Sequence, residues 1–118
     1  MNAAVCRTSG LPLLADREIE RAAASAALQK HVWAELGSHL SAVLPGFPVL
    51  VFGSLAKPGA FHAGSDIDLG IEKEPPGTTL YRLTAELSDR MGLPVDIVVL
   101  ETCRFAAKIR KEGIPWTP

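Results

Sequence analysis

Two aspartates stand one residue apart in a stretch that is otherwise apolar. Asp66 and Asp68 lie in the segment SDIDLGI, residues 65–71, whose alternating pattern is typical of a strand with one buried face. Residues i and i+2 of a strand project to the same face, so both carboxylates point one way while Ile67 and Leu69 face the core. Two anions this close repel each other unless a cation neutralises them. Mg²⁺ is suited to this because it prefers oxygen ligands and commonly uses one or two carboxylates together with substrate phosphates.

A third carboxylate comes from a later predicted strand. In the segment VDIVV, residues 95–99, Asp96 is the only charge, and we expect it to be buried among the valines. If this strand lies beside the strand of residues 65–71 with matching pleat, Asp96 projects to the same face as Asp66 and Asp68. Three such carboxylates can hold two metal ions about 4 Å apart, which supports in-line nucleotidyl transfer. A DxD pair alone is also common as surface charge in turns and edge strands. A buried Asp96 favours a functional site, because unpaired buried carboxylates are disfavoured.

The strand before the aspartates ends in Gly53 and Ser54. The apolar run PVLVFG, residues 48–53, predicts a central strand. Gly53 would let the backbone approach a ligand closely, and Ser54 would cap a short helix beginning at Leu55, whose free N–H groups suit phosphate oxygens. Lys57 offers a cation to the same phosphates. P-loop spacing is absent, and Gly53-Ser54 in isolation is typical of a strand-to-helix turn; the nearby DxD pair favours the phosphate role.

Helices must position these motifs. A long amphipathic helix with a break near Gly37 is predicted first, and its apolar stripe consists of Ile19, Ala23, Ala26, Trp33, Leu36, Leu40 and Val43. We expect Asp16 to be the N-cap of this first helix. A second helix should have Thr78 or Thr79 as its N-cap and should end at Gly92. The last helix should start at Thr102. The last helix is basic, with Arg104, Lys108, Arg110 and Lys111. The first interpretation is a solvated face that complements the helix C-terminus, and the second is a contact with a partner or with phosphate. The order of elements predicts an α/β (α+β) fold with a small mixed three-stranded sheet flanked by helices.

Composition and charge limit the class of protein. The 118 residues fit a single domain, residues 1–118, whose first dozen residues (1–12) we expect to be poorly ordered. The formal net charge of -1 argues against general nucleic-acid binding, for which domains are usually strongly basic. Cys6 and Cys103 lack disulfide or zinc spacing, and no apolar run approaches the ~20 residues of a membrane span, so we expect a cytoplasmic protein. Because the predicted sheet is small, we also expect homo- or hetero-oligomers.

Together these motifs resemble those of a known family. A GS pair at the end of a strand, a short loop, the sequence SDIDL and a third aspartate on a later strand are similar to the DNA polymerase beta-like nucleotidyltransferase superfamily. The small size and the order of elements look like its minimal nucleotidyltransferase (MNT) branch, whose members are commonly encoded beside a HEPN-domain partner. The resemblance covers about residues 47–118. Many members have an arginine and a glycine after the GS motif, whereas Lys57-Pro58-Gly59 stands here, and lysine lacks the bidentate fork of arginine.

The resemblance implies roles for the residues already described. The residues expected to bind the nucleotide are Gly53, Ser54, Lys57 and Ser65. The residues expected to be catalytic and to hold a two-ion Mg²⁺ site are Asp66, Asp68 and Asp96, the last of which could instead act as base toward the incoming hydroxyl. The resemblance further implies an antitoxin that transfers AMP from ATP to a tyrosine of a HEPN-type ribonuclease toxin. Two alternatives stay open: transfer to a small-molecule acceptor by a homodimer, and a non-catalytic subunit that binds nucleotide or neutralises a toxin by contact.

Overall fold

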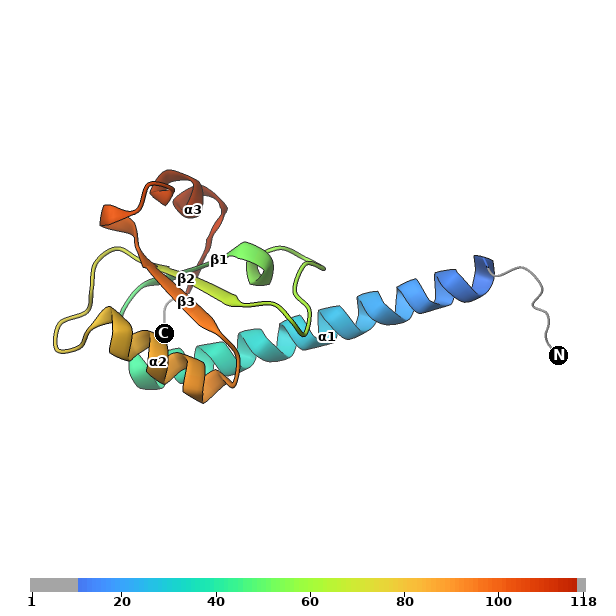
Figure 1. The fold of residues 1–118 in the computed structure, drawn as a ribbon, viewed down its shortest axis with the longest axis horizontal. Coiled ribbons are helices and arrows are strands. Elements are labelled where there is room, and N and C mark those ends of the chain that lie inside the picture. Colours follow the sequence, from blue (N-terminus) through green and yellow to red (C-terminus); the bar gives the residue numbers. More distant parts are fainter. Residues whose placement is uncertain (1–10, 117–118) are drawn as a thin grey trace.

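Within residues 11–116, which the structure describes, the protein combines three α-helices with one sheet. The computed structural model describes the backbone of residues 11–116 and the side chains of residues 17–116 (Figure 1). Its elements in chain order are α1 (Leu11–Val43), β1 (Val49–Phe52), the 3₁₀ helix η1 (Gly53–Ala56), β2 (Ile67–Ile71), α2 (Leu80–Met91), β3 (Val95–Val99), the 3₁₀ helix η2 (Leu100–Thr102), α3 (Ala106–Glu112) and β4 (Ile114–Trp116). The α+β class is confirmed. The expected disorder of residues 1–12 falls outside the described residues, apart from Leu11 and Pro12, which belong to α1.

The sheet is mixed, as predicted, but it has four strands rather than three. Its order is β3-β2-β1-β4, with β1 antiparallel to both β2 and β4, and β2 parallel to β3. The missed strand, β4, is three residues long and contains Pro115. A proline is tolerated there because β4 lies at the edge of the sheet, where one side of the strand needs no backbone donor.

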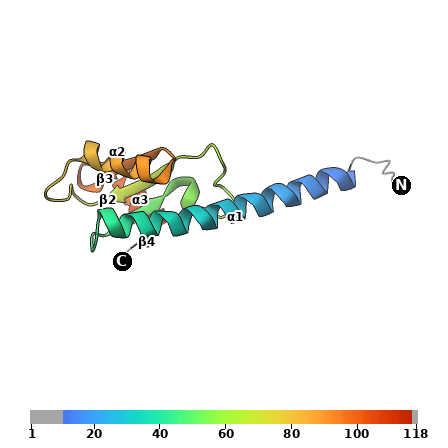
Figure 2. The ribbon, with the colours of Figure 1, turned by 90° about the horizontal axis from the view of Figure 1, so that it is seen from below.

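The two faces of the sheet are covered differently (Figures 1 and 2). Helices α1 and α2 pack on one face, against the side chains of Ile67, Leu69 and Ile71, each of which is at most 1 % exposed. This is the alternation that the sequence predicts for β2. The short α3 lies on the opposite face, where Ile109 and Leu100 form a smaller apolar cluster. The main core therefore fixes the sheet from one side and leaves much of the other side free.

Helix α1 differs from its prediction at both places where a boundary was expected. It begins at Leu11, so Asp16 lies inside it rather than at its N-cap, and it continues unbroken through Gly37. At Gly37 the helix packs closely against β4, because a Cβ there would lie 3.3 Å from Nε1 of Trp116. This glycine serves close packing and not a helix break.

The apolar stripe of α1 reaches the core only in its second half. Leu36 and Leu40 are fully buried, whereas Ile19 is 67 % exposed and Ala23 and Ala26 are exposed as well. Figures 1 and 2 show why: the first half of α1 extends beyond the sheet. The periodicity predicts the helix correctly but not how much of it is covered. None of the described helices combines the length and apolar character that crossing a membrane requires.

The other helix boundaries are partly as predicted. Thr79 caps α2, since its Oγ1 accepts a hydrogen bond from the N–H of Arg82 at 3.2 Å, and Gly92 ends α2 with φ of 68°. The last helix starts later than expected. Thr102 belongs to η2, where its hydroxyl donates to the carbonyl of Val99 at 3.3 Å, and α3 begins at Ala106.

Two substitutions on α1 test how much of the helix contributes to the core. Leu36→Ala should lower the free energy of unfolding by about 2–5 kcal/mol, because it removes a fully buried side chain and leaves a cavity. Ile19→Ala should change it by no more than about 0.5 kcal/mol, because this side chain is mostly exposed. Urea denaturation of both variants measures the difference, and equal losses would contradict the described arrangement of α1.

Candidate active site

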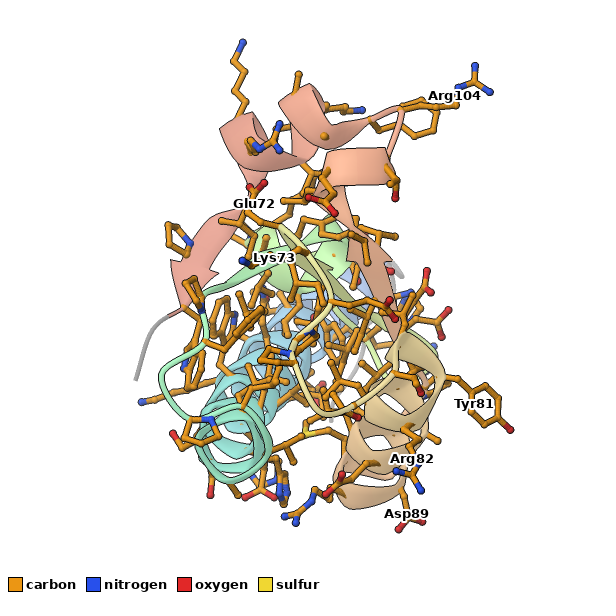
Figure 3. All side chains as sticks on the ribbon, turned by 90° about the vertical axis from the view of Figure 1, so that its left-hand side faces the viewer. Glu72, Lys73, Tyr81, Arg82, Asp89 and Arg104 are labelled. Atoms are coloured by element: carbon orange, nitrogen blue, oxygen red, sulfur yellow. The ribbon has the colours of Figure 1, made fainter. Side chains whose placement is uncertain are left out.

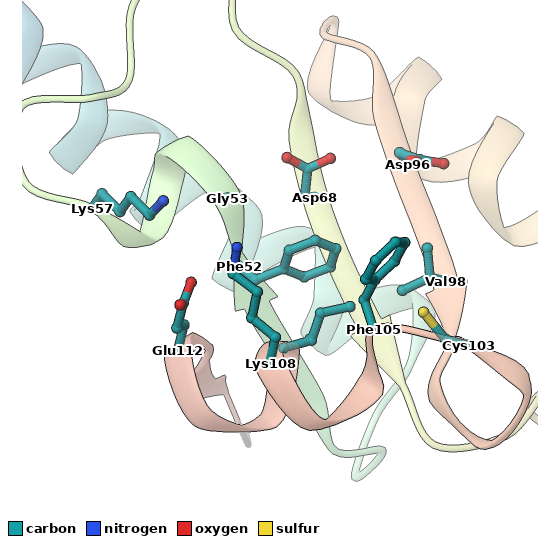
Figure 4. Close-up of a pocket in the computed structure, with 11 residues that line it drawn as sticks. Phe52, Gly53, Lys57, Asp68, Asp96, Val98, Cys103, Phe105, Lys108 and Glu112 are labelled. Atoms are coloured by element: carbon teal, nitrogen blue, oxygen red, sulfur yellow. The ribbon is translucent and has the colours of Figure 1, made fainter.

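Two of the three predicted carboxylates face each other across neighbouring strands. In the parallel pair of β2 and β3, Asp68 lies directly opposite Asp96, and on the other side of β2 it lies opposite Phe52 of β1. Residues in register share a face of the sheet, so all three side chains project toward the α3 side. Figure 4 shows the two carboxylates side by side above the rings of Phe52 and Phe105.

Asp96 is exposed, so the expectation that it is buried among valines is wrong. The physical reason is the position of β3 at the edge of the sheet. Its neighbours Val95 and Ile97 point to the covered face and are each 5 % exposed, while Asp96 points to the face that α3 leaves open. Val95 and Ile97 are therefore buried while Asp96, between them in the sequence, is not.

A pocket of about 360 Å³ opens at these carboxylates, a size within the range of small-molecule sites. Its chemical character comes from seven charged or aromatic side chains: three carboxylates (Asp68, Asp96, Glu112), two lysines (Lys57, Lys108) and two aromatic rings (Phe52, Phe105). The pocket exists because α3 covers the sheet near Leu50 and Val98 but not as far as the carboxylates. One cleft thus holds anionic, cationic and aromatic groups.

The carboxyl group of Asp68 is perturbed by its surroundings. Burial raises the pKa of Asp68 above its ordinary value, and the charges of Asp96 and, to a lesser degree, Asp66 raise it further. Asp66 lies one residue before β2, is exposed, and is not among the residues that line the pocket. The structure therefore brings Asp68 and Asp96 into the pocket and leaves Asp66 beside it, close enough for its charge to act on Asp68.

The pocket suits a hard divalent cation held by two carboxylates. Among the side chains of residues 17–116, no three His, Cys, Asp or Glu residues are grouped as ligands of one metal ion. Mg²⁺ commonly uses only one or two protein carboxylates and completes its shell with water and substrate phosphates. Asp68 and Asp96 provide such a donor pair, and their mutual repulsion is what a bound cation would relieve.

Gly53 makes room for the Asp68 carboxylate. Its φ is 73°, in the left-handed region, and a Cβ built on it would overlap Oδ2 of Asp68 and lie 3.1 Å from its Cγ. The predicted close approach of the Gly53 backbone is therefore present, but in this structure the group that it approaches is a carboxylate of the protein itself.

The turn after β1 is anchored by α1 rather than capped by Ser54. Ser54 lies inside η1, whose N-cap position is Phe52 and receives no side-chain hydrogen bond, so the predicted cap is wrong. Instead, Nε2 of Gln29 and Nε1 of Trp33 donate to the carbonyl of Leu55 at 2.8 and 2.9 Å. Two side chains of α1 thus hold the turn that presents the Gly53 backbone to the pocket.

Ser65 has a local structural contact. Its side chain is buried, its Oγ accepts a hydrogen bond from the N–H of His62 at 3.0 Å, and its own N–H donates to the carbonyl of His62 at 2.9 Å. It closes the loop that leads into β2. Neither Ser54 nor Ser65 is among the residues that line the pocket, whereas Gly53 and Lys57 are.

Seven lining residues are not predicted as site residues from the sequence, and four of these are aromatic or charged: Phe52, Phe105, Lys108 and Glu112. The sequence predicts Lys108 only as part of the basic face of the last helix, with a partner or phosphate contact as the second interpretation. The three residues at and before α3 are spaced by three and four positions, the spacing of neighbours on one face of a helix. This spacing could have grouped them, but only the packing of α3 on the sheet shows that their face borders the aspartates.

The raised pKa of Asp68 predicts a stability change with pH. The folded state holds the Asp68 proton more tightly than the unfolded chain does, so ionisation costs stability once the pH rises above the unfolded value of about 3.9. Asp68→Asn removes this cost and should make the metal-free protein more stable at pH 7. Near pH 3, about one unit below that value, the advantage should vanish because wild-type Asp68 is then protonated in both states. Thermal unfolding in the presence of EDTA measures the stability difference between variant and wild type at both pH values. An Asp68→Asn variant less stable than wild type at pH 7 would contradict the raised pKa of Asp68.

The contact of Gly53 with Asp68 can be separated from backbone strain. Gly46 has a similar φ of 75° but open space where its Cβ would be. Gly46→Ala should therefore cost about 1–2 kcal/mol of unfolding free energy from strain alone, and Gly53→Ala should cost more because its Cβ displaces the carboxylate. An Asp68→Ala background removes the carboxylate but keeps the Cβ 3.3 Å away, so most of the extra cost of Gly53→Ala should disappear there. An extra cost that persists in full in that background would place its origin elsewhere.

Known proteins support the same interpretation of the fold. The family model "Polymerase beta, Nucleotidyltransferase" matches residues 48–115, more than half of the chain, and this range includes Gly53, Asp68 and Asp96. A solved structure described as a candidate minimal nucleotidyltransferase shares 30% sequence identity at a TM-score of 0.60 and covers 75% of this chain and 95% of that chain. No curated protein matches the sequence. On this evidence the chain belongs to the polymerase beta-like nucleotidyltransferase family.

Proposed function

We propose that this chain is a Mg²⁺-dependent nucleotidyltransferase that transfers AMP from ATP to a hydroxyl group of a protein. The observation that carries the proposal is the register that sets Asp68 opposite Asp96 at the mouth of a pocket with two lysines. Membership of the family supports nucleotidyl transfer as the reaction type. The carboxylate pair supports a divalent cation, and the lysines support a polyphosphate as the ligand.

Each side chain of the pocket has a role in this reaction. Asp68 and Asp96 would hold Mg²⁺, which when bound neutralises the phosphate charges and stabilises the leaving pyrophosphate. Lys57 attracts the phosphate oxygens from the side of η1. The acceptor oxygen attacks the α-phosphorus, the bond to the β-phosphate breaks, and pyrophosphate leaves. Asp96 accepts the hydroxyl proton, since it is the more exposed of the two carboxylates and can be reached by an acceptor from outside.

The acceptor in our proposal is a tyrosine of a HEPN-type toxin, which makes the chain an antitoxin. Two features support it: the resemblance to the MNT branch in sequence and fold, and the exposure of Asp96 on an edge strand that a second protein can approach. A homodimer that modifies a small molecule, or a subunit that binds without transfer, would use the same pocket.

Labelled ATP distinguishes these functions. The chain is incubated with Mg²⁺ and α-phosphate-labelled ATP, with and without the product of the neighbouring gene. Label on the partner protein supports our proposal, label on small molecules supports the homodimer, and tight binding without transfer supports the non-catalytic subunit.

Three substitutions connect transfer to the carboxylate pair. Asp68→Asn and Asp96→Asn should each lower the rate of transfer by at least about 100-fold, because each removes a cation ligand or a base. Asp89→Asn is the matched control, since Asp89 is an exposed aspartate on α2 that lies outside the pocket (Figure 3). Transfer that survives both pocket substitutions, or falls equally in the control, would overturn the assignment.

A further inference from the structure

Phe105 is a large apolar side chain that the fold leaves exposed beside the carboxylates. It is 64 % exposed, lies directly before α3, and lines the pocket. It is absent from the apolar cluster that α3 forms with the sheet, which is built around Leu100, Ala106 and Ile109. Figure 4 shows its ring rising from the α3 side toward the carboxylates of Asp68 and Asp96. Core packing therefore does not account for this ring.

The ring of Phe105 has one supported side. The guanidinium carbon of Arg104 lies 5.9 Å from the ring centroid, within the distance of a cation–π contact. This contact restricts the ring without burying it. An exposed aromatic ring that is held in place at a pocket is the arrangement by which proteins stack on nucleobases.

Lys108 extends this surface toward the phosphate end of the pocket. It lies three residues after Phe105, on the same helical face, and Figure 4 shows its side chain directed toward Gly53. Among the described side chains, neither Lys57 nor Lys108 forms an ion pair. The pocket thus holds two lysines that form no ion pair among the described side chains, although Asp68, Asp96 and Glu112 also line it.

We infer that α3 and the residue before it form the nucleotide-recognition wall of the pocket. Phe105 stacks on the nucleobase, and Lys108 contacts the triphosphate together with Lys57. The inference rests on the proposed function, since it takes a nucleoside triphosphate as the ligand. It assigns base recognition to stacking, which accepts any base through its π-face.

Substitution of Glu112 tests the inference in the opposite direction, because it should strengthen nucleotide binding instead of weakening it. It lies four residues after Lys108 and lines the same pocket, at the end of α3 nearer to Lys57. An anion in this position repels a triphosphate, so Glu112→Gln should strengthen nucleotide binding by about 2- to 5-fold, the effect of one partly screened charge. Lys108→Ala should weaken it by at least a similar factor.

Two probes separate the base from the phosphates. Equilibrium binding to the full chain is measured with MgATP and with Mg-tripolyphosphate, which has no base. Phe105→Ala should weaken MgATP binding by about 5- to 150-fold and leave tripolyphosphate binding unchanged, and Phe105→Tyr should restore it. Lys108→Ala should weaken the binding of both probes. One matched control is Tyr81→Ala, which removes an 83 % exposed aromatic side chain of α2 (Figure 3). The other is Lys111→Ala, which removes a lysine of α3 that does not line the pocket.

The outcomes keep the inference separate from the proposed function. If wild type binds MgATP but Phe105→Ala binds it equally well, or loses both probes alike, the recognition wall is wrong while the proposed function stands. If wild type binds neither probe, both are wrong. Thermal unfolding of each variant checks folding, which we expect to be unchanged because the substituted side chains are exposed.

Discussion

The parallel register of β2 and β3 is the constraint on which the rest of the structure depends, because it sets Asp68 directly against Asp96. Burial raises the pKa of Asp68 and the opposed charge of Asp96 raises it further, so this placement carries a cost in the absence of a cation. The register is held by apolar side chains on the opposite face. Ile67, Leu69 and Ile71 are buried against α1 and α2, and a slip of one residue would expose all of them. The hydrophobic core thus enforces an electrostatic strain that a metal ion would relieve.

Helix α3 covers the opposite face of the sheet only in part, so the carboxylates of Asp68 and Asp96 remain accessible to a ligand. Gly70 lets α3 approach the sheet closely, since a Cβ there would lie 3.3 Å from Cγ2 of Ile109. At the same end of β2, Nη2 and Nε of Arg110 donate to the two carboxylate oxygens of Glu72 at 2.7 and 2.9 Å, and this contact lowers the pKa of Glu72. Helix α3 is therefore tied to the sheet near Gly70, two residues from Asp68, and the carboxylates stay open to a ligand.

The sequence predicts local features well and features that arise from packing poorly. The alternation in β2 and the cap at Thr79 follow from short-range rules, and the structure has both. The exposure of Asp96 depends on β3 lying at a sheet edge, which no local pattern shows. The strand β4 pairs with a segment more than 60 residues away, and its proline argues against a strand. Phe105 and Lys108 look like ordinary surface residues until α3 is placed over the sheet.

The central claim is that Asp68 and Asp96 bind one divalent cation together with a nucleotide. Crystals grown with Mn²⁺ and a non-hydrolysable ATP analogue test this directly, because manganese is located by its anomalous scattering. We predict an anomalous peak between the two carboxylates, within about 2.0–2.6 Å of at least one oxygen from each. A peak elsewhere in a crystal that contains the bound analogue, or bound analogue with no metal between Asp68 and Asp96, would contradict the account.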